Sequence, residues 1–315
     1  MEKFFIKLSL FFAILSVIIY VINERYIIVR NTSSTDKFKN VPEKIQICNF
    51  GSSHGANGYH YNDLANDYTC FNFAMASQSL DYDWRIMQCY QDKIDDNAVV
   101  FITISYFSFY GIDETKTNNF LSKNKRYYRF LPKEFIKEYD LKTDIFENKL
   151  PALTAYENLL IDLLRGTKDE DIMEDEESIN MEIYTKAAYK RHFVNEKLDK
   201  NGERIQNQEH VDSLYNMIEL CKKKGVSVIL VTTPYLKEYT DIVIENDPEF
   251  FDDFYGIIDQ VVLDTNVRYY DFSRDDRFQK DYGSFVNADH LNHEGAIKFV
   301  NILMEEIGEL LITMQ

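Results

Sequence analysis

The amino-acid sequence predicts an α/β fold, in which a five-stranded parallel sheet forms the middle layer of a three-layer α/β/α sandwich and one transmembrane helix precedes the domain. Short runs rich in β-branched and aromatic residues alternate with helical patterns, and this alternation indicates a parallel sheet covered on both faces. An uncharged apolar stretch near the amino terminus predicts the membrane helix. The predicted strands are Ile45–Phe50, Tyr68–Phe73, Ala98–Ile104, Val226–Thr232 and Val267–Phe272.

Helical segments with one apolar face separate these strands. The chain from Ser79 to Ile94 predicts the helix between the second and third strands. Asn207 is a favourable N-cap for a later helix, and Gly225 is a favourable stop. Apolar residues recur at helical spacing in that helix and in the last one: Val211, Leu214, Tyr215, Ile218 and Cys221, then Ala296, Phe299, Val300, Leu303, Ile307, Leu310 and Leu311. Each of these helices therefore has one apolar face that can pack against the sheet.

The composition is that of a globular protein that does not bind nucleic acid. With 315 residues, of which 45% are hydrophobic and 28% charged, the chain can bury a full core. Its net charge of -17 would repel nucleic-acid phosphates, and no basic patch is visible in the sequence. Cys48, Cys70, Cys89 and Cys221 have no C-x-x-C spacing, which disfavours a zinc knuckle or a redox dithiol. A Cys48–Cys70 disulfide is one interpretation, and buried free thiols are the preferred one.

The amino terminus predicts an uncleaved membrane anchor. Leu8 to Ile22 contain no charge, and Phe4 to Ile6 extend the stretch toward the roughly 20 residues that span a bilayer if Lys7 reaches the headgroups. The following residues offer no small-x-small site, so an anchor is preferred to a cleavable signal peptide. We expect an anchor at residues 1–24, a linker at 25–43 and one domain at 44–315.

Charge does not decide on which side of the membrane the domain lies. Basic residues both precede and follow the apolar stretch, so the positive-inside count leaves the orientation open. These residues are Lys3 and Lys7 before it and Arg25, Arg30, Lys37 and Lys39 after it.

A helical insert at about residues 111–206 is longer than a usual crossover between parallel strands. Ala152–Leu164 and Ile179–Tyr189 have helical patterns within it. The acidic run KDEDIMEDEES, residues 168–178, is interpreted as a solvated loop in preference to a metal site, because it lacks the spacing of a calcium loop. We expect the insert to form a cap or side wall beside the carboxyl edge of the sheet.

Two polar turns are predicted to meet at that edge. The first is the Gly51–Gly55 turn, GSSHG, which follows the first strand and can present a hydroxyl beside backbone N–H groups. A serine hydroxyl needs a base to take its proton. The loop before the last helix, FVNADHLNHEGAIKF, supplies Asp289, His290 and His293. In open parallel sheets, ligands bind outside the carboxyl ends of the strands.

The motifs NFGSSHG and ADHLNHEGA, in this order, resemble the SGNH/GDSL hydrolase superfamily. In detail they are similar to its membrane-anchored envelope branch, which includes proteins of teichoic-acid D-alanylation and exopolysaccharide O-acetylation. The likeness covers most of the chain from Lys44 onward, apart from the insert. It implies a flavodoxin-like sheet of SGNH type, Ser53 as the nucleophile and His290 as the catalytic base.

Three positions depart from the family pattern. Asn287 stands where the family commonly has an acid three residues before the histidine, so either Asp289, Asn287 or a backbone carbonyl orients His290. Ala74 replaces the glycine that serves as an oxyanion donor. The asparagine of the third block has no match, and Ser105 lies at that point.

Three further side chains are candidates for the walls of the site. His54 is interpreted as a structural or substrate-contacting residue in preference to a base. Tyr235 follows the fourth strand at the same edge, where it either lines the site or packs. His293 is interpreted as a capping or surface residue.

The resemblance implies a membrane-anchored serine esterase or O-acyltransferase that acts on an acylated cell-envelope polymer through a covalent acyl-serine. Asp289 would orient His290, and no metal or organic cofactor is required. The implied partners are the lipid bilayer, an acylated glycan or teichoic-acid-like polymer, and a membrane-bound acyltransferase. The implied location is the cell membrane, single-pass, with the domain outside the cytoplasm.

Two rival hypotheses remain open. A zinc-dependent hydrolase would use His290 and His293 with Asp289 or His54, although an H-x-x-H loop lacks the glutamate of helical zinc motifs. An inactive SGNH-fold protein could instead bind glycan or act as a scaffold in an envelope assembly complex, since fold does not imply turnover.

Overall fold

The computed structural model describes residues 1–30, 34–153 and 181–308. The chain divides into two compact units: Met1–Asn40 with Leu121–Glu174, and Val41–Phe120 with Asp175–Gln315. Part of the predicted insert therefore groups with the amino-terminal segment, and part with the sheet. The acidic run at 168–178 and most of the helix predicted at 152–164 lie outside the described residues.

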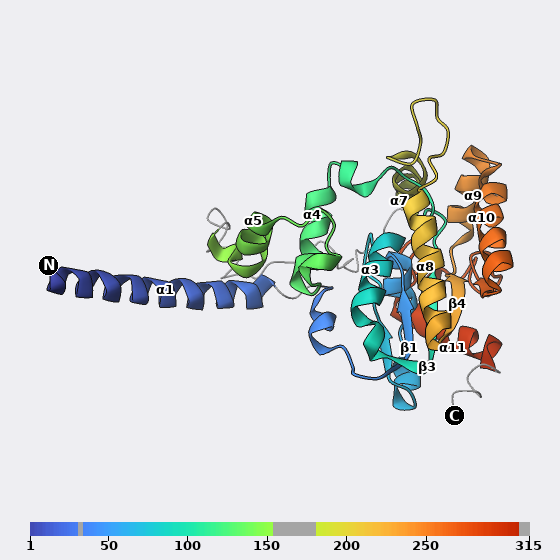
Figure 1. Ribbon diagram of the computed structural model, residues 1–315. Helices are drawn as coiled ribbons and strands as arrows, with labels where there is room; N and C mark the ends of the chain where they lie inside the picture. Colours follow the sequence, from blue (N-terminus) through green and yellow to red (C-terminus); the bar gives the residue numbers. More distant parts are fainter. Residues whose placement is uncertain (31–33, 154–180, 309–315) are drawn as a thin grey trace. The chain divides into compact units, whose positions relative to one another are not determined.

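The first unit contains the apolar helix α1 (Glu2–Arg30), drawn in dark blue in Figure 1. The segment Glu2–Tyr26 is long and apolar enough to cross a membrane, judged by length and composition, and most of its large hydrophobic side chains are exposed, while Tyr26 is buried. The helix continues six residues beyond the predicted end of the anchor, because the segment from Arg25 to Arg30 contains no glycine or proline to stop it. The first residues of the linker predicted at 25–43 are therefore helical.

Short helical segments follow in the described part of the first unit. Asn23 of α1 is buried there, where its amide donates to the carbonyl of Lys149 over 2.7 Å and its carbonyl accepts from Ala152 N–H. The segments are η1 (Asp36–Asn40), α4 (Phe120–Asn124), η5 (Lys125–Arg129), η6 (Lys133–Phe135), α5 (Leu141–Thr143), η7 (Asp144–Lys149) and η8 (Pro151–Leu153).

The second unit is built on a five-stranded parallel sheet in the order β2-β1-β3-β4-β5, which confirms the predicted fold class. The order reverses between β1 and β3, and such a reversal leaves a crevice at the carboxyl ends of the strands. The edge strands are shorter than predicted, because each pairs on one side only. The strands are β1 (Ile45–Phe50), β2 (Cys70–Asn72), β3 (Ile94–Thr103), β4 (Ser227–Thr232) and β5 (Arg268–Asp271).

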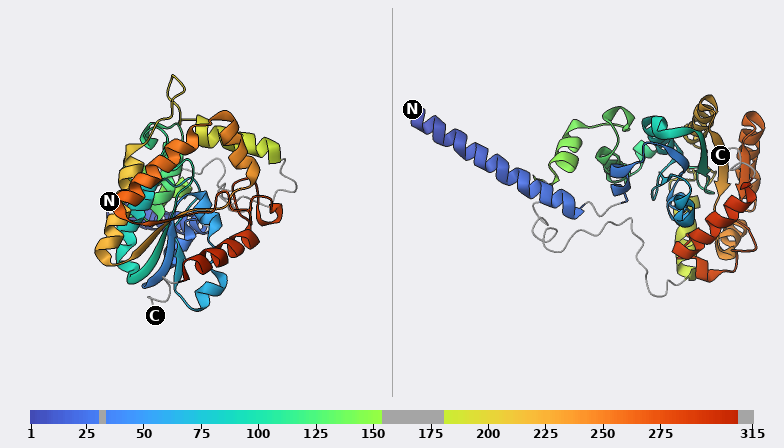
Figure 2. Two further views of the ribbon diagram at one scale, coloured as in Figure 1. Left: turned by 90° about the vertical axis from the view of Figure 1, so that its right-hand side faces the viewer. Right: turned by 90° about the horizontal axis from the view of Figure 1, so that it is seen from below.

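Helices cover both faces of this sheet (Figure 2). On one face, α3 (Leu80–Tyr90) and α8 (Gln208–Lys224) pack against each other, and Cys221 of α8 lies 4.0 Å from Met87 of α3. On the other face, α2 (Ser53–Gly58) and α11 (His293–Glu306) pack on a core that includes Ile47, Val99 and Phe299. Successive strand residues alternate between these two faces.

The remaining elements connect the strands or flank them. As predicted, the Asn207 side chain caps α8 and Gly225, with a φ of 75°, ends it. The predicted helix at 179–189 is α7 within the described residues. The connecting elements are η2 (Asn62–Asn66), η3 (Gln91–Lys93), η4 (Glu114–Lys116), α7 (Met181–Tyr189), η9 (Lys190–Val194), α9 (Lys237–Asn246), α10 (Phe250–Thr265) and η10 (Tyr282–Ser284).

The four cysteines are free thiols, so the Cys48–Cys70 disulfide interpretation is wrong. The register explains this result, because Cys70 is paired with Ile47 and Cys48 with Phe71. Cys48 and Cys70 are therefore one position out of register, and their side chains point to opposite faces of the sheet.

Gly295 lies where α11 closely approaches the backbone of Ser284. Substituting Gly295 therefore tests the packing of α11 at this point. A Cβ at Gly295 would lie 2.0 Å from the carbonyl oxygen of Ser284, which is backbone and cannot move aside. We expect Gly295→Ala to lower the free energy of unfolding by about 1–3 kcal/mol or more, measured as a lower urea midpoint at unchanged m-value.

Gly256→Ala in α10 is the matched control, because nothing lies within 4 Å of its added Cβ. That substitution should raise stability by about 0.5–1 kcal/mol, as expected for alanine in a helix interior. Equal midpoints for the two variants would contradict the packing described for α11.

Candidate active site

The turn after β1 holds its backbone in a conformation that requires glycine. Gly51 has a φ of +138°, and a Cβ there would lie 2.7 Å from Thr103 Cβ of the neighbouring strand. The Gly51 N–H donates to a carboxylate oxygen of Asp83 over 2.8 Å. Ser52 then occupies the N-cap of α2, and Ser53 begins the helix. The turn therefore fixes where the two serine hydroxyls point.

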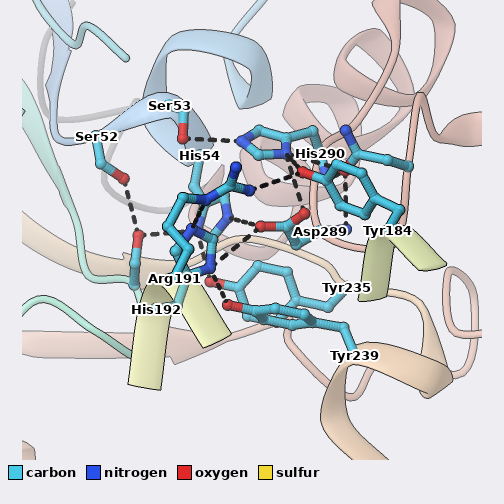
Figure 3. Close-up of polar contacts among 12 residues, drawn as sticks. Ser52, Ser53, His54, Tyr184, Arg191, His192, Tyr235, Tyr239, Asp289 and His290 are labelled. Atoms are coloured by element: carbon cyan, nitrogen blue, oxygen red, sulfur yellow. Dashed lines mark hydrogen bonds and ion pairs between the residues drawn. The ribbon is translucent and has the colours of Figure 1, made fainter. Parts of the chain in front are cut away.

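The two hydroxyls face different partners (Figure 3). Ser53 Oγ lies 2.8 Å from His290 Nε2, in the loop between η10 and α11. Ser52 is buried, and its Oγ lies 3.0 Å from Ser105 Oγ, at the end of β3. Only the Ser53 hydroxyl therefore contacts a histidine of the C-terminal loop.

The other nitrogen of His290 fixes its tautomer. Nδ1 lies 3.0 Å from Asn287 Oδ1 and 3.1 Å from Asp289 Oδ1. Since both oxygens can only accept, Nδ1 carries the proton and Nε2 presents its lone pair to Ser53. Asn287 Oδ1 also accepts the backbone N–H groups of Asp289 and His290, which folds the loop around the imidazole. This is the tautomer that a general base requires.

Asp289 is a buried carboxylate shared by two imidazoles. Its Oδ1 contacts His290, and its Oδ2 accepts from His54 Nε2 over 3.0 Å. Burial alone would raise the pKa of Asp289, but its electrostatic interaction with His290 and the hydrogen bonds from His290 and His54 hold that pKa well below its ordinary range. The carboxylate is therefore ionised.

Two further histidines are buried behind this carboxylate. His54 Nδ1 accepts from the hydroxyls of Ser105 and Tyr235, each at 2.9 Å, and burial lowers the pKa of His54. His192 Nδ1 donates to the Tyr239 hydroxyl over 2.7 Å, and burial lowers its pKa well below the ordinary value. Both imidazoles are therefore neutral near pH 7.

Side chains from α7 and η9 reach the site. The Tyr184 hydroxyl lies 3.4 Å from His290 Nδ1, and the Arg191 guanidinium donates to that hydroxyl over 3.3 Å. Arg191 Nε also donates to His192 Nε2 over 3.2 Å. Sequence reasoning did not single out Tyr184, Arg191 or His192, because their segment carries no motif, and the expected position of the insert beside the edge was the signal for them. Tyr239 was also missed, although it lies in the same segment as Tyr235, which was expected at that edge.

Ala74 and Ser105 do not have the surroundings expected of substrate-binding groups. The Ala74 N–H donates to Asn72 Oδ1 over 3.0 Å, so an oxyanion would have to displace that contact, and the role of Ala74 as an oxyanion donor stays a prediction. The Asn72 amide in turn donates to the carbonyls of Gly55 and Ala56 in α2. The Ser105 hydroxyl contacts Ser52 and His54, not Ser53.

The structure does not bring His290 and His293 into one ligand group, as the zinc hypothesis required. The His293 ring packs edge-on against His60, with centroids 4.6 Å apart. Donor atoms of His54, Asp289 and His290 do lie within 4.8 Å of one another and could hold a metal ion. Each of these three side chains also has hydrogen-bond partners within the protein.

Comparisons with known proteins leave the family open. No protein-family model matches the sequence, and no curated protein matches it. Among solved structures, a Bacteroides fragilis NCTC 9343 protein described as a putative acylhydrolase is similar, with a TM-score of 0.40 and 10% identity, covering 91% of this chain and 98% of that chain. Likeness at this level assigns neither family nor activity.

The neutral His192 should make stability depend on pH. Because the folded pKa lies below the ordinary 6.5, the unfolded chain binds a proton that the folded chain does not. The resulting stability is present above about pH 6.5 and is lost as pH falls toward the folded pKa, by about 1.4 kcal/mol per pH unit. His192→Gln, measured by urea unfolding at about pH 7.5 and about pH 5.5, should lose less stability on acidification than the wild type.

His293→Gln is the matched control, because His293 is exposed. Its pH dependence should follow that of the wild type. An equal loss of unfolding free energy on acidification in the wild type and in His192→Gln would contradict the neutral buried state of His192.

Proposed function

We propose that this protein is a membrane-anchored serine esterase or O-acyltransferase that acts through a covalent acyl-Ser53. The observation that supports it most directly is the 2.8 Å contact between Ser53 Oγ and the lone-pair nitrogen of His290. A serine becomes a nucleophile when such a base takes its proton during attack. The order of the motifs, with serine after the first strand and histidine before the last helix, agrees with the SGNH resemblance.

In the proposed reaction, Ser53 Oγ attacks the carbonyl carbon of an ester while its proton moves to His290 Nε2. The tetrahedral intermediate collapses as His290 returns that proton to the leaving alcohol, which leaves an acyl-Ser53. Water or a sugar hydroxyl then attacks the acyl group, with His290 as base, and Ser53 is released.

Asp289 and Asn287 divide the task of supporting His290. The ionised Asp289 stabilises the imidazolium that forms after proton transfer, because opposite charges at 3.1 Å attract strongly in a buried site. Asn287 carries no charge, and its contacts to Nδ1 and two backbone N–H groups orient the ring. The Ser53 N–H is a candidate oxyanion donor, since the first turn of a helix has no internal acceptor for it.

The proposed substrate is an acylated cell-envelope polymer outside the cytoplasm, reached from the bilayer that α1 would span. The acyl group would be acetyl or similarly small, and a membrane-bound acyltransferase would be its donor. A neutral glycan is preferred to a teichoic-acid-like polymer, because a chain of net charge -17 repels a polyanion.

Labelling with a fluorophosphonate tests the activated serine. The detergent-solubilised full chain should be labelled, and Ser53→Ala and His290→Ala should abolish labelling because each removes half of the nucleophile–base pair. Ser52→Ala is the matched control and should remain labelled, since Ser52 contacts Ser105 and not His290. Absence of labelling in the folded wild type would favour the inactive scaffold instead.

A second pair of variants tests which group supports His290. Asp289→Asn should slow labelling by about 10²–10⁴-fold, the usual range for general-base support. Adding Asn287→Asp to that variant should recover part of the rate, since it places a carboxylate on the same nitrogen. Wild-type labelling by Asp289→Asn would remove Asp289 from the proposed mechanism.

A further inference from the structure

A second group of metal-binding side chains lies on the α3 and α8 side of the sheet, apart from Ser53. It consists of Asp81 in the first turn of α3, Glu114 in η4 and His210 in the first turn of α8. One donor atom from each lies within 4.8 Å of the other two, and Asp81 and His210 are buried. We propose that this group binds a divalent transition-metal cation, with Zn²⁺ as the test ion, which ties α3, α8 and the segment after β3 together.

His210 is oriented as a metal ligand. Its Nδ1 lies 2.9 Å from the carbonyl oxygen of Ser108, which can only accept, so Nδ1 carries the proton and Nε2 presents a lone pair. Metal-binding histidines commonly donate their other N–H to a carbonyl in this way. His210 Nε2 lies 3.5 Å from Asp81 Oδ1. Neighbouring donors in a tetrahedral zinc site are about 3.4 Å apart, given bonds of about 2.0–2.2 Å.

The charge of the group also favours a cation. Two carboxyl groups and an imidazole converge there, with Asp81 and His210 buried, and a divalent cation at this point would stabilise the ionised form of the carboxyl groups. The Ser79 hydroxyl donates to Asp81 Oδ1 over 2.5 Å. Carboxylates that bind metals commonly accept such a hydrogen bond, which holds them in orientation. A nitrogen and two carboxylates form a donor set that suits Zn²⁺.

One contact competes with the cation for the lone pair of His210. Asn207 Nδ2 lies 3.3 Å from His210 Nε2, and it would donate there when no cation is bound. The same amide lies 3.4 Å from the carbonyl of Ile112, so it keeps an acceptor when a cation takes the lone pair.

The group connects to both segments that flank the Ser53 turn. Asp83, two residues after Asp81, accepts the N–H of Gly51. Ser108, whose carbonyl accepts from His210, accepts the N–H of Ser105 with its hydroxyl. A bound cation would therefore stabilise the turn and the end of β3 from behind, without contact to Ser53.

Metal content tests the proposal on the full chain in detergent. After loading with Zn²⁺ and dialysis, inductively coupled plasma mass spectrometry should find about one zinc per wild-type chain. Zinc at about a hundredfold excess over its Kd should raise Tm by roughly 4 °C. Both effects should be lost in Asp81→Asn and His210→Ala, and the half-buried Glu114→Gln provides a third variant if either fails to fold.

Two controls separate this site from other histidines. The double variant His60→Ala/His293→Ala removes the histidine pair in edge-on contact, and His290→Ala removes a member of the group around Asp289. Both should retain zinc. Failure of the wild type to retain zinc, or loss of zinc in His290→Ala with retention in Asp81→Asn, would overturn the proposal. Neither result bears on fluorophosphonate labelling of Ser53, so the two proposals fail separately.

Discussion

The candidate active site depends on one buried carboxylate. Asp289 accepts hydrogen bonds from His290 through one oxygen and from His54 through the other. An ionised carboxylate at this depth costs several kcal/mol unless its oxygens are bonded, so both contacts are needed. Because Ser53 and His54 are consecutive on α2, and Asp289 and His290 are consecutive on their loop, the same docking that satisfies the carboxylate also places Ser53 Oγ against His290 Nε2.

The sheet brings these two dipeptides together. β1 lies beside β3 at the centre, so the turn that starts α2 emerges at the reversal of strand order. α11 returns to the same face as α2, which places its preceding loop beside that turn. Glycine permits both close approaches: Gly51 against Thr103, and Gly295 against Ser284. The placement of Ser53 and His290 therefore depends on glycine at both of these close approaches, since a Cβ does not fit at either one.

The sequence was sufficient for the sheet and for the Ser53–His290 pairing, because strand alternation and motif order carry topological information. It was insufficient for features that depend on contacts between distant parts of the chain. Nothing local in the sequence shows that His54 is buried against Asp289, or that His192 and Tyr184 reach the site from the end of the insert. Nor does the sequence show that the side chain of Asn72 accepts the N–H of Ala74. The helical continuation of α1 past Glu24 was not anticipated, because the anchor was bounded by hydrophobicity alone, and the residues from Arg25 to Arg30 contain no glycine or proline.

Trapping the acyl-enzyme would test whether the reaction passes through a covalent acyl-Ser53. The full chain would be mixed with an activated acetyl ester, quenched in acid during turnover, and mapped by peptide mass spectrometry across Ser52 and Ser53. The account predicts a single acetyl group on Ser53, because its hydroxyl alone of the two contacts His290. An acetyl group on Ser52, or ester turnover with neither serine modified, would contradict it.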